Sequence, residues 1–148
     1  MNNLLRNVKI TRIKADGAGS ASATPTKCDI IDMAGFDSVM FIAAMGNVLD
    51  TSAVSLKVAG ATTNSTGAMA LLAGSAGGTA SATSYDDKLV ILDVVKPTYQ
   101  YLEAQLFHVT ADGPFDGIFA IQYNAKDLPI TQGSTVVASS TIYSPALA

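Results

Sequence analysis

Short apolar stretches with a two-residue alternation recur along this chain, and this periodicity constrains its fold more than any other feature. In residues 53–59, AVSLKVA, three apolar side chains alternate with Ser55 and Lys57, as in a strand with one buried face. No long stretch has apolar residues at the three-and-four spacing of an amphipathic helix. About eight or nine such strands, separated by roughly 8–12 residues, predict an all-β sandwich or barrel.

One expected strand, residues 39–45, is apolar on both faces. Such a strand fits a place where one face meets the core and the other meets a neighbouring molecule. Gly, Asp and Pro favour turns over residues 35–38 and 112–114. The expected strands lie at residues 7–14, 28–32, 39–45, 53–59, 68–73, 88–95, 99–109 and 115–124.

The small-residue segment 60–84 is rich in Gly, Ala, Ser and Thr. Its sequence leaves two interpretations open: a flexible loop, or a small-residue surface packed against a partner. Within it, residues 79–84 are ambiguous between strand and loop.

The charge content limits how much of the surface is exposed to water. Charged residues make up 14% of the 148 residues, against about 25% in a typical soluble domain. Interface cores are depleted in charge, so we expect other subunits to cover part of the surface; a Ser/Thr/Asn surface on a monomer is the alternative. We divide the chain into a basic N-terminal strand or arm (1–15), a β-sandwich domain (16–127) and an uncharged extended C-terminal arm (128–148).

Four basic residues give the first fifteen positions a charge of +4 without any acid, while the remaining five basic and twelve acidic residues sum to −7. The net charge of −3 argues against nucleic acid as a partner, because neutralising phosphates needs clustered Lys and Arg. The basic segment is suited to an acidic protein surface, although a solvated strand face explains it equally well. The partner-binding candidates here are Arg6, Lys9, Arg12 and Lys14.

The C-terminal arm contains no charged side chain over residues 128–148. Disordered tails are usually charged or strongly polar, whereas this segment is β-prone and is bounded by Pro129 and Pro145. We expect an extended arm that adds a strand to another chain or lies across it; a final strand of the same domain is the alternative. Its candidate partner-binding residues are Val136, Val137, Ile142 and Tyr143.

Side chains suited to catalysis or metal binding are scarce. His108 is the only histidine and lacks ligands at metal-site spacing, so we expect a partly exposed structural residue. Cys28 is the only cysteine and is expected to be inert packing. The aspartates at 29, 32 and 37 do not match a calcium loop and are expected to cap turns. We therefore expect neither an enzyme nor a cofactor or metal site.

The N-terminus lacks the apolar run of a signal peptide. The longest apolar run, residues 39–46, is too short to span a membrane. Synthesis in a reducing cytoplasm, with no membrane partner, is therefore expected.

Two segments resemble the small decoration, or cement, proteins of tailed bacteriophages. In that family an apolar-acidic run precedes Gly-Phe-(Asp/Glu)-Ser-Val, an alternating strand and a glycine. The second segment, residues 96–106, KPTYQYLEAQL, is similar to the family's Arg/Lys-x-x-Tyr-hydrophobic strand. The resemblance covers about residues 28–124 and departs from the pattern in the small-residue segment. The matching residues of the first segment are Ile31, Asp32, Gly35, Phe36, Asp37, Ser38, Val39 and Gly46.

The resemblance implies a jelly-roll β-sandwich of about eight strands, usually trimeric, on the outer surface of an icosahedral head. It would bind at threefold or quasi-threefold positions and clamp neighbouring major capsid subunits, so its partners would be the major capsid protein and itself. Its location would be the exterior of the virion, after synthesis in the host cytoplasm. A receptor- or carbohydrate-binding sandwich of a phage tail or fibre is the alternative.

Overall fold

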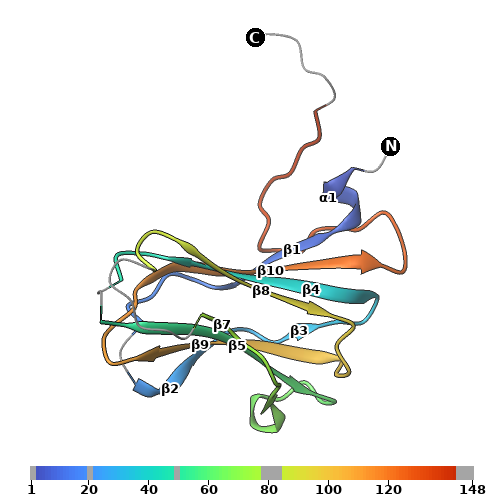
Figure 1. Cartoon of the computed structure of the whole chain (residues 1–148). Helices are drawn as coiled ribbons and strands as arrows, with labels where there is room; N and C mark the ends of the chain where they lie inside the picture. Colours follow the sequence, from blue (N-terminus) through green and yellow to red (C-terminus); the bar gives the residue numbers. More distant parts are fainter. Residues whose placement is uncertain (1–2, 20–21, 49–50, 78–84, 143–148) are drawn as a thin grey trace, which may run out of the picture.

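Two antiparallel sheets face each other in the computed structural model, which describes residues 3–19, 22–48, 51–77 and 85–142 (Figure 1). Sheet A is four-stranded, in the order β1 (Lys9–Lys14), β10 (Phe115–Ala125), β4 (Phe36–Met45) and β8 (Leu89–Val95). Sheet B is six-stranded and comprises β2 (Ser22–Lys27), β3 (Ile31–Asp32), β9 (Tyr101–Val109), β5 (Ala53–Ala61), β6 (Ala70–Leu71) and β7 (Ala76–Gly77). Two short helices complete the described elements, α1 (Leu4–Asn7) and η1 (Thr66–Ala68).

The chain passes back and forth between the two sheets. Strands β1, β4, β8 and β10 belong to sheet A, and the strands between them in sequence belong to sheet B. In sheet B, β9 pairs with β2, β3 and β5, while β5 also pairs with β6 and β7. Two facing sheets connected in this way are jelly-roll-like, so the predicted all-β, jelly-roll-like sandwich is confirmed.

The described residues form ten strands, where the sequence predicted about eight or nine. Strand β2, with the sequence SATPTK, had no counterpart in the prediction because it is small and polar and contains Pro25. A proline is tolerated there because β2 lies at the end of the sheet B order. The weak apolar run at 68–73 forms only the two-residue strand β6.

The core forms between the sheets, and the two-residue alternation of the strands decides which side chains enter it. In β5 the alternating Val54, Leu56 and Val58 point inward, as predicted. In sheet A, β4 contributes its odd-numbered residues. The bulkiest fully buried apolar side chains are Phe41, Ile13, Leu56, Leu102, Leu106 and Ile118.

The turn predicted over residues 35–38 lies earlier in the structure. Ala34 and Gly35 form the turn, and β4 already begins at Phe36. Asp32 fixes this turn because its Oδ1 accepts a hydrogen bond from the Ala34 amide at 2.8 Å, the turn-capping role expected of it. Gly35 has φ = +86°, a conformation that favours glycine. The strand expected over 28–32 is reduced to Ile31–Asp32.

The described part of the C-terminal arm has no regular secondary structure. Residues 126–142 contain neither helix nor strand, so this part of the arm is not a final strand of the sandwich. The arm leaves the molecule on the side of sheet A, next to α1 (Figure 1). The ambiguous residues 79–84 and Tyr143 lie outside the described residues.

Candidate interaction surfaces

The inner half of the arm, residues 128–136, is tied to the N-terminal segment of the same chain. The central contact is Gln132, whose Oε1 accepts a hydrogen bond from the Ile10 amide at 2.9 Å. Its Nε2 donates to the backbone carbonyls of Leu5, at 3.1 Å, and Val8, at 2.7 Å. One side chain therefore joins the arm to both α1 and β1.

Further hydrogen bonds extend this tether in both directions. The Ile130 amide donates to the carbonyl of Arg6 at 2.9 Å, and Thr135 Oγ1 accepts from the Arg12 amide at 3.3 Å. Strand β1 ends the order of sheet A, and an unprotected edge strand is a template for unwanted pairing. The arm protects this edge with side chains. The sequence predicted that the arm would lie across another chain, but its inner half lies on its own.

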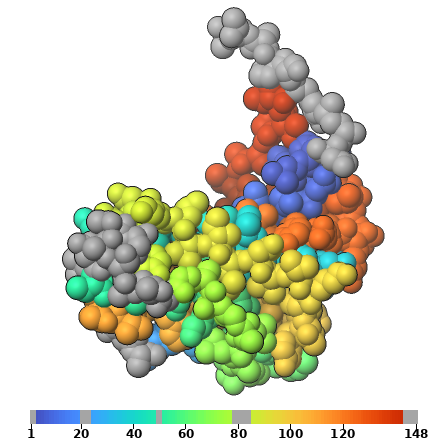
Figure 2. All heavy atoms as spheres, viewed as in Figure 1, coloured from blue at the N-terminus to red at the C-terminus, as the bar shows by residue number. Residues whose placement is uncertain are grey.

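The outer half of the arm, residues 137–142, is exposed. Val137 is fully exposed, and Ile142 is 69% exposed. Val136 is half-buried, and its amide donates to the Gly133 carbonyl at 3.1 Å in a local turn. Figure 2 shows the arm and α1 standing together as one protrusion from the sandwich. Two of the predicted arm residues, Val137 and Ile142, are thus open to a partner.

The four basic N-terminal residues are distributed over two elements. Arg6 is exposed on α1, while Lys9 and Lys14 on β1 are half-buried. Arg12 forms an ion pair with Asp16 at 3.8 Å, and its Nη2 donates to the carbonyl of Asp116 at 3.4 Å. The binding of these four basic residues to an acidic partner stays a prediction. Of the four, Arg12 already forms an ion pair and a hydrogen bond within its own chain.

The outer face of sheet A is apolar across all four of its strands. On β8, Leu89, Ile91 and Val95 are 60%, 47% and 61% exposed, because Val90 and the other even-numbered residues face the core. Half-buried apolar residues of the neighbouring strands continue this face, namely Ile10, Met40, Ile42, Phe119 and Ile121. The sequence predicted an outward apolar face for β4, but not its continuation over the whole sheet.

Two charged residues lie on this face, and each has a partner. Arg12 lies at the edge, in its ion pair. Asp93 accepts a hydrogen bond from Tyr123 Oη, at 2.8 and 3.0 Å from its two carboxylate oxygens. This hydrogen bond, together with burial, raises the pKa of Tyr123. The face therefore offers little to a strongly charged partner.

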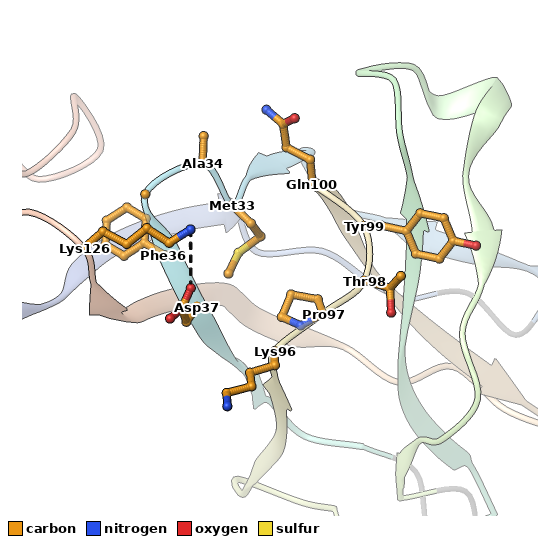
Figure 3. A pocket seen from close by; sticks show the side chains of 11 residues that line it. Met33, Ala34, Phe36, Asp37, Lys96, Pro97, Thr98, Tyr99, Gln100 and Lys126 are labelled. Atoms are coloured by element: carbon orange, nitrogen blue, oxygen red, sulfur yellow. Dashed lines mark ion pairs between the residues drawn. The ribbon is translucent and has the colours of Figure 1, made fainter.

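The two segments that resemble the decoration family meet at one end of the sandwich, where they line a cleft of about 590 Å³ (Figure 3). The first contributes the turn before β4, and the second contributes the β8–β9 loop. Backbone hydrogen bonds join these segments, from Met33 to Gln100 and from Lys96 to Asp37, both at 2.8 Å. The Lys126–Asp37 ion pair, at 3.6 Å, is exposed and so contributes little to stability. These two segments therefore build this end of the fold.

His108 is buried, so the prediction that it would be partly exposed is wrong. Its side chain is 2% exposed, because it belongs to the inward-facing series of β9 with Leu102 and Leu106. Its ring stacks on Phe115 with the ring centres 6.5 Å apart. Among the described residues neither ring nitrogen has a hydrogen-bond partner. Burial lowers the pKa of His108, and the nearby charge of Asp112 opposes this only partly.

Two further ionisable groups are buried. Cys28 is inaccessible, as expected, and burial raises the pKa of its thiol to about 12, so the reactive thiolate is scarce at neutral pH. Glu103 and Gln105 alternate with the core residues of β9, yet both are buried. Gln105 Nε2 donates to Glu103 Oε1 at 2.6 Å, and Glu103 Oε2 has no partner among the described residues. Sequence alternation predicted the inward face of β9, but not the burial of its outward face.

Within the described residues, no group of three or more His, Cys, Asp or Glu side chains could hold a metal ion. In the same part of the chain, no helix is long and apolar enough to cross a membrane. No protein-family model matches this sequence, and a search of curated proteins finds no matching relative.

Proposed function

We propose that this protein decorates the outside of an icosahedral phage capsid and stabilises the shell by clamping neighbouring major capsid subunits as a trimer. The observation that carries the proposal is the pairing of an apolar, nearly uncharged outer face of sheet A with an exposed, uncharged arm on the same side of the molecule. Surfaces of this kind are suited to being covered by other protein chains. The resemblance over residues 28–124 supports the same function.

The physical basis of such a clamp is multivalency. Three modest contacts made by one trimer act together, because the second and third form at a high effective concentration. A protein that binds only the mature shell stabilises that shell by mass action. No single contact then needs to be strong.

Co-sedimentation with purified expanded heads of the phage that encodes the chain tests this proposal. The full chain should sediment with these heads and raise their melting temperature. A chain of residues 1–128 should remain folded but bind more weakly, because without the arm the trimer that makes several contacts at once is weakened. Full-length protein that is folded and trimeric but stays in the supernatant would contradict the proposal.

A receptor- or carbohydrate-binding sandwich of a phage tail or fibre is the second candidate. The observation in its favour is the cleft, whose lining combines the polar side chains of Lys96, Thr98 and Gln100 with apolar Pro97 (Figure 3). Tyr99 packs against Gly60 instead of presenting its ring as a platform for a sugar. A glycan array probed with the full chain and with Gln100→Ala separates the two candidates, since the decoration protein should give no glycan signal.

A further inference from the structure

We infer that the outer half of the arm of one copy binds across the outer face of sheet A of a second copy. This inference rests on the proposed function only in requiring that the protein self-associates. It names the two surfaces that meet, one from each chain.

The outer face of sheet A is large enough to serve as a binding patch. Four strands spaced about 4.8 Å apart span roughly 14 Å, and four outward side chains along a strand extend about 20 Å. The resulting patch of roughly 300 Å² is comparable with the largest apolar patch on a typical monomer, which is often functional. Leu89, Ile91 and Val95 are its most exposed members.

The chemistry of the face selects an uncharged occupant. Of its two charged residues, Asp93 is hydrogen-bonded to Tyr123 and Arg12 is paired with Asp16. A partner bearing unpaired Lys or Glu would have to desolvate that charge against Ile and Leu side chains without compensation. Residues 137–142, VASSTI, carry no charge. Their apolar members, Val137 and Ile142, are exposed in the single chain.

The course of the arm keeps it off the face of its own chain. Gln132 and Thr135 fix the inner half along the open edge of β1. Beyond this tether the arm follows α1, where Asn3 Nδ2 donates to Thr141 Oγ1 at 2.7 Å. In Figure 1 this part of the chain points away from the sandwich. Burying Val137 and Ile142 while keeping these contacts therefore requires another molecule.

The arm is long enough to cross the neighbouring face. Six extended residues span about 20 Å, which exceeds the roughly 14 Å across four strands. In a ring of identical subunits each copy donates one arm and receives one, so every contact is satisfied when the ring closes. Such head-to-tail exchange fits the proposed trimer.

Disulfide trapping tests this inference directly, because buried Cys28 with its raised pKa leaves the native chain without a reactive thiol. Two differently tagged chains, Val137→Cys and Ile91→Cys, are mixed, dissociated, reassembled and oxidised. The matched control replaces Ile91→Cys with Leu71→Cys on sheet B, where Leu71 is 51% exposed and Ile91 is 47% exposed. A short bifunctional thiol cross-linker replaces the oxidant in a parallel reaction, to allow for imperfect disulfide geometry.

We expect a mixed-tag dimer with the 137–91 pair, at least ten-fold more abundant than with the 137–71 pair. Equal yields from both pairs, or no mixed dimer from either in a sample that is trimeric by light scattering, would overturn the inference. A trimer that binds phage heads without this cross-link would leave the proposed function standing. Folded monomer that neither cross-links nor binds heads would contradict both.

Discussion

Gln132 Oε1 lies 2.9 Å from the backbone nitrogen of Ile10 and accepts its hydrogen bond. A residue of the C-terminal arm thereby occupies the open edge of the first strand, 122 positions away in the sequence. The same side chain donates to two carbonyls in the segment that leads into β1. The arm thus protects the sheet edge with its inner half and leaves its outer half exposed.

Gln132→Ala should loosen the arm. The change removes three partly buried hydrogen bonds, and a hydrogen bond of this kind contributes a net stabilisation of about 0.5–1.5 kcal/mol. Because water replaces some of the lost hydrogen bonds, we expect the free energy of unfolding to fall by about 1–2 kcal/mol. Denaturant unfolding measures this loss. Hydrogen exchange should show faster exchange of the Ile10 amide.

Ser139→Ala is the matched control, because Ser139 is exposed in the outer half of the arm and should leave both quantities unchanged. Gln132→Glu refines the test, since it keeps the acceptor for Ile10 but places a carboxylate against two carbonyls. It should destabilise the chain at least as much as Gln132→Ala. Slow exchange at Ile10 in Gln132→Ala would mean that the arm does not protect this edge.

His108 should make stability pH-dependent. Burial lowers its pKa in the folded state below the usual 6.5, so the unfolded state binds more protons once the pH falls below about 6.5. The free energy of unfolding should therefore fall as the pH is lowered from about 6.5 to the folded-state pKa, by at most about 1.4 kcal/mol per pH unit. Urea unfolding between pH 7.5 and 5 measures this slope.

His108→Leu is the comparison for this slope, because leucine has a similar volume and no titrating group. The carboxylates, including the neighbouring Asp112, titrate in both proteins. The difference between the two slopes of unfolding free energy against pH therefore gives the contribution of His108 alone. Identical slopes in the two proteins would show that His108 titrates equally in the folded and unfolded states.

Gly113→Ala should strain the packing around His108. A β-carbon at position 113 would clash with His108 Nδ1, and crowding of this kind costs about 1–3 kcal/mol. Gly67→Ala is the control, since its nearest neighbour, Ser65 Oγ, would be 3.8 Å away. Adding Gly113→Ala to a His108→Ala background should cost much less, because the two positions are in contact. If Gly113→Ala destabilises the His108→Ala protein as much as it destabilises the original chain, the strain comes from the backbone and not from contact with His108.

Ile91→Asp should weaken self-association without unfolding the sandwich. The Ile91 side chain is 47% exposed on the outer face of sheet A, so a carboxylate there is solvated in the monomer but desolvated in an assembled state. Light scattering at several concentrations should show a shift from the proposed trimer toward the 15.2 kDa monomer. Leu71→Asp on β6 of sheet B is the control and should assemble normally. An unchanged trimer in Ile91→Asp would move the interface elsewhere.

The two-residue alternation of apolar residues accounts for most of the fold prediction, because the side chains of β5 point inward and outward as the sequence implies. His108 was predicted to be partly exposed because of its polarity, yet it lies in the inward series of β9. Strand β2 was not predicted because its side chains are small and polar. Its place in the sheet depends on long-range pairing with β9. Local sequence carries little of that information.

The interaction surfaces were predictable only in part. The absence of charged residues over 128–148 predicted an arm that contacts a partner. The exposed side chains of Val137 and Ile142 are open to such a contact. The tether through Gln132 depends on the meeting of two chain ends in space, which no local pattern reveals. The apolar outer face likewise requires the strand order of sheet A, because Ile91, Ile42 and Phe119 are far apart in sequence.

The most direct test of the capsid-decoration account is electron microscopy, with a gold-labelled antibody against this chain, of the phage particles that the account predicts to carry it. The account predicts gold over the outer surface of mature heads, with little on the tail. Gold confined to the tail or its fibres would contradict the account and support the receptor-binding candidate. Particles that carry no gold, although the same antibody detects the chain in infected cells, would contradict both.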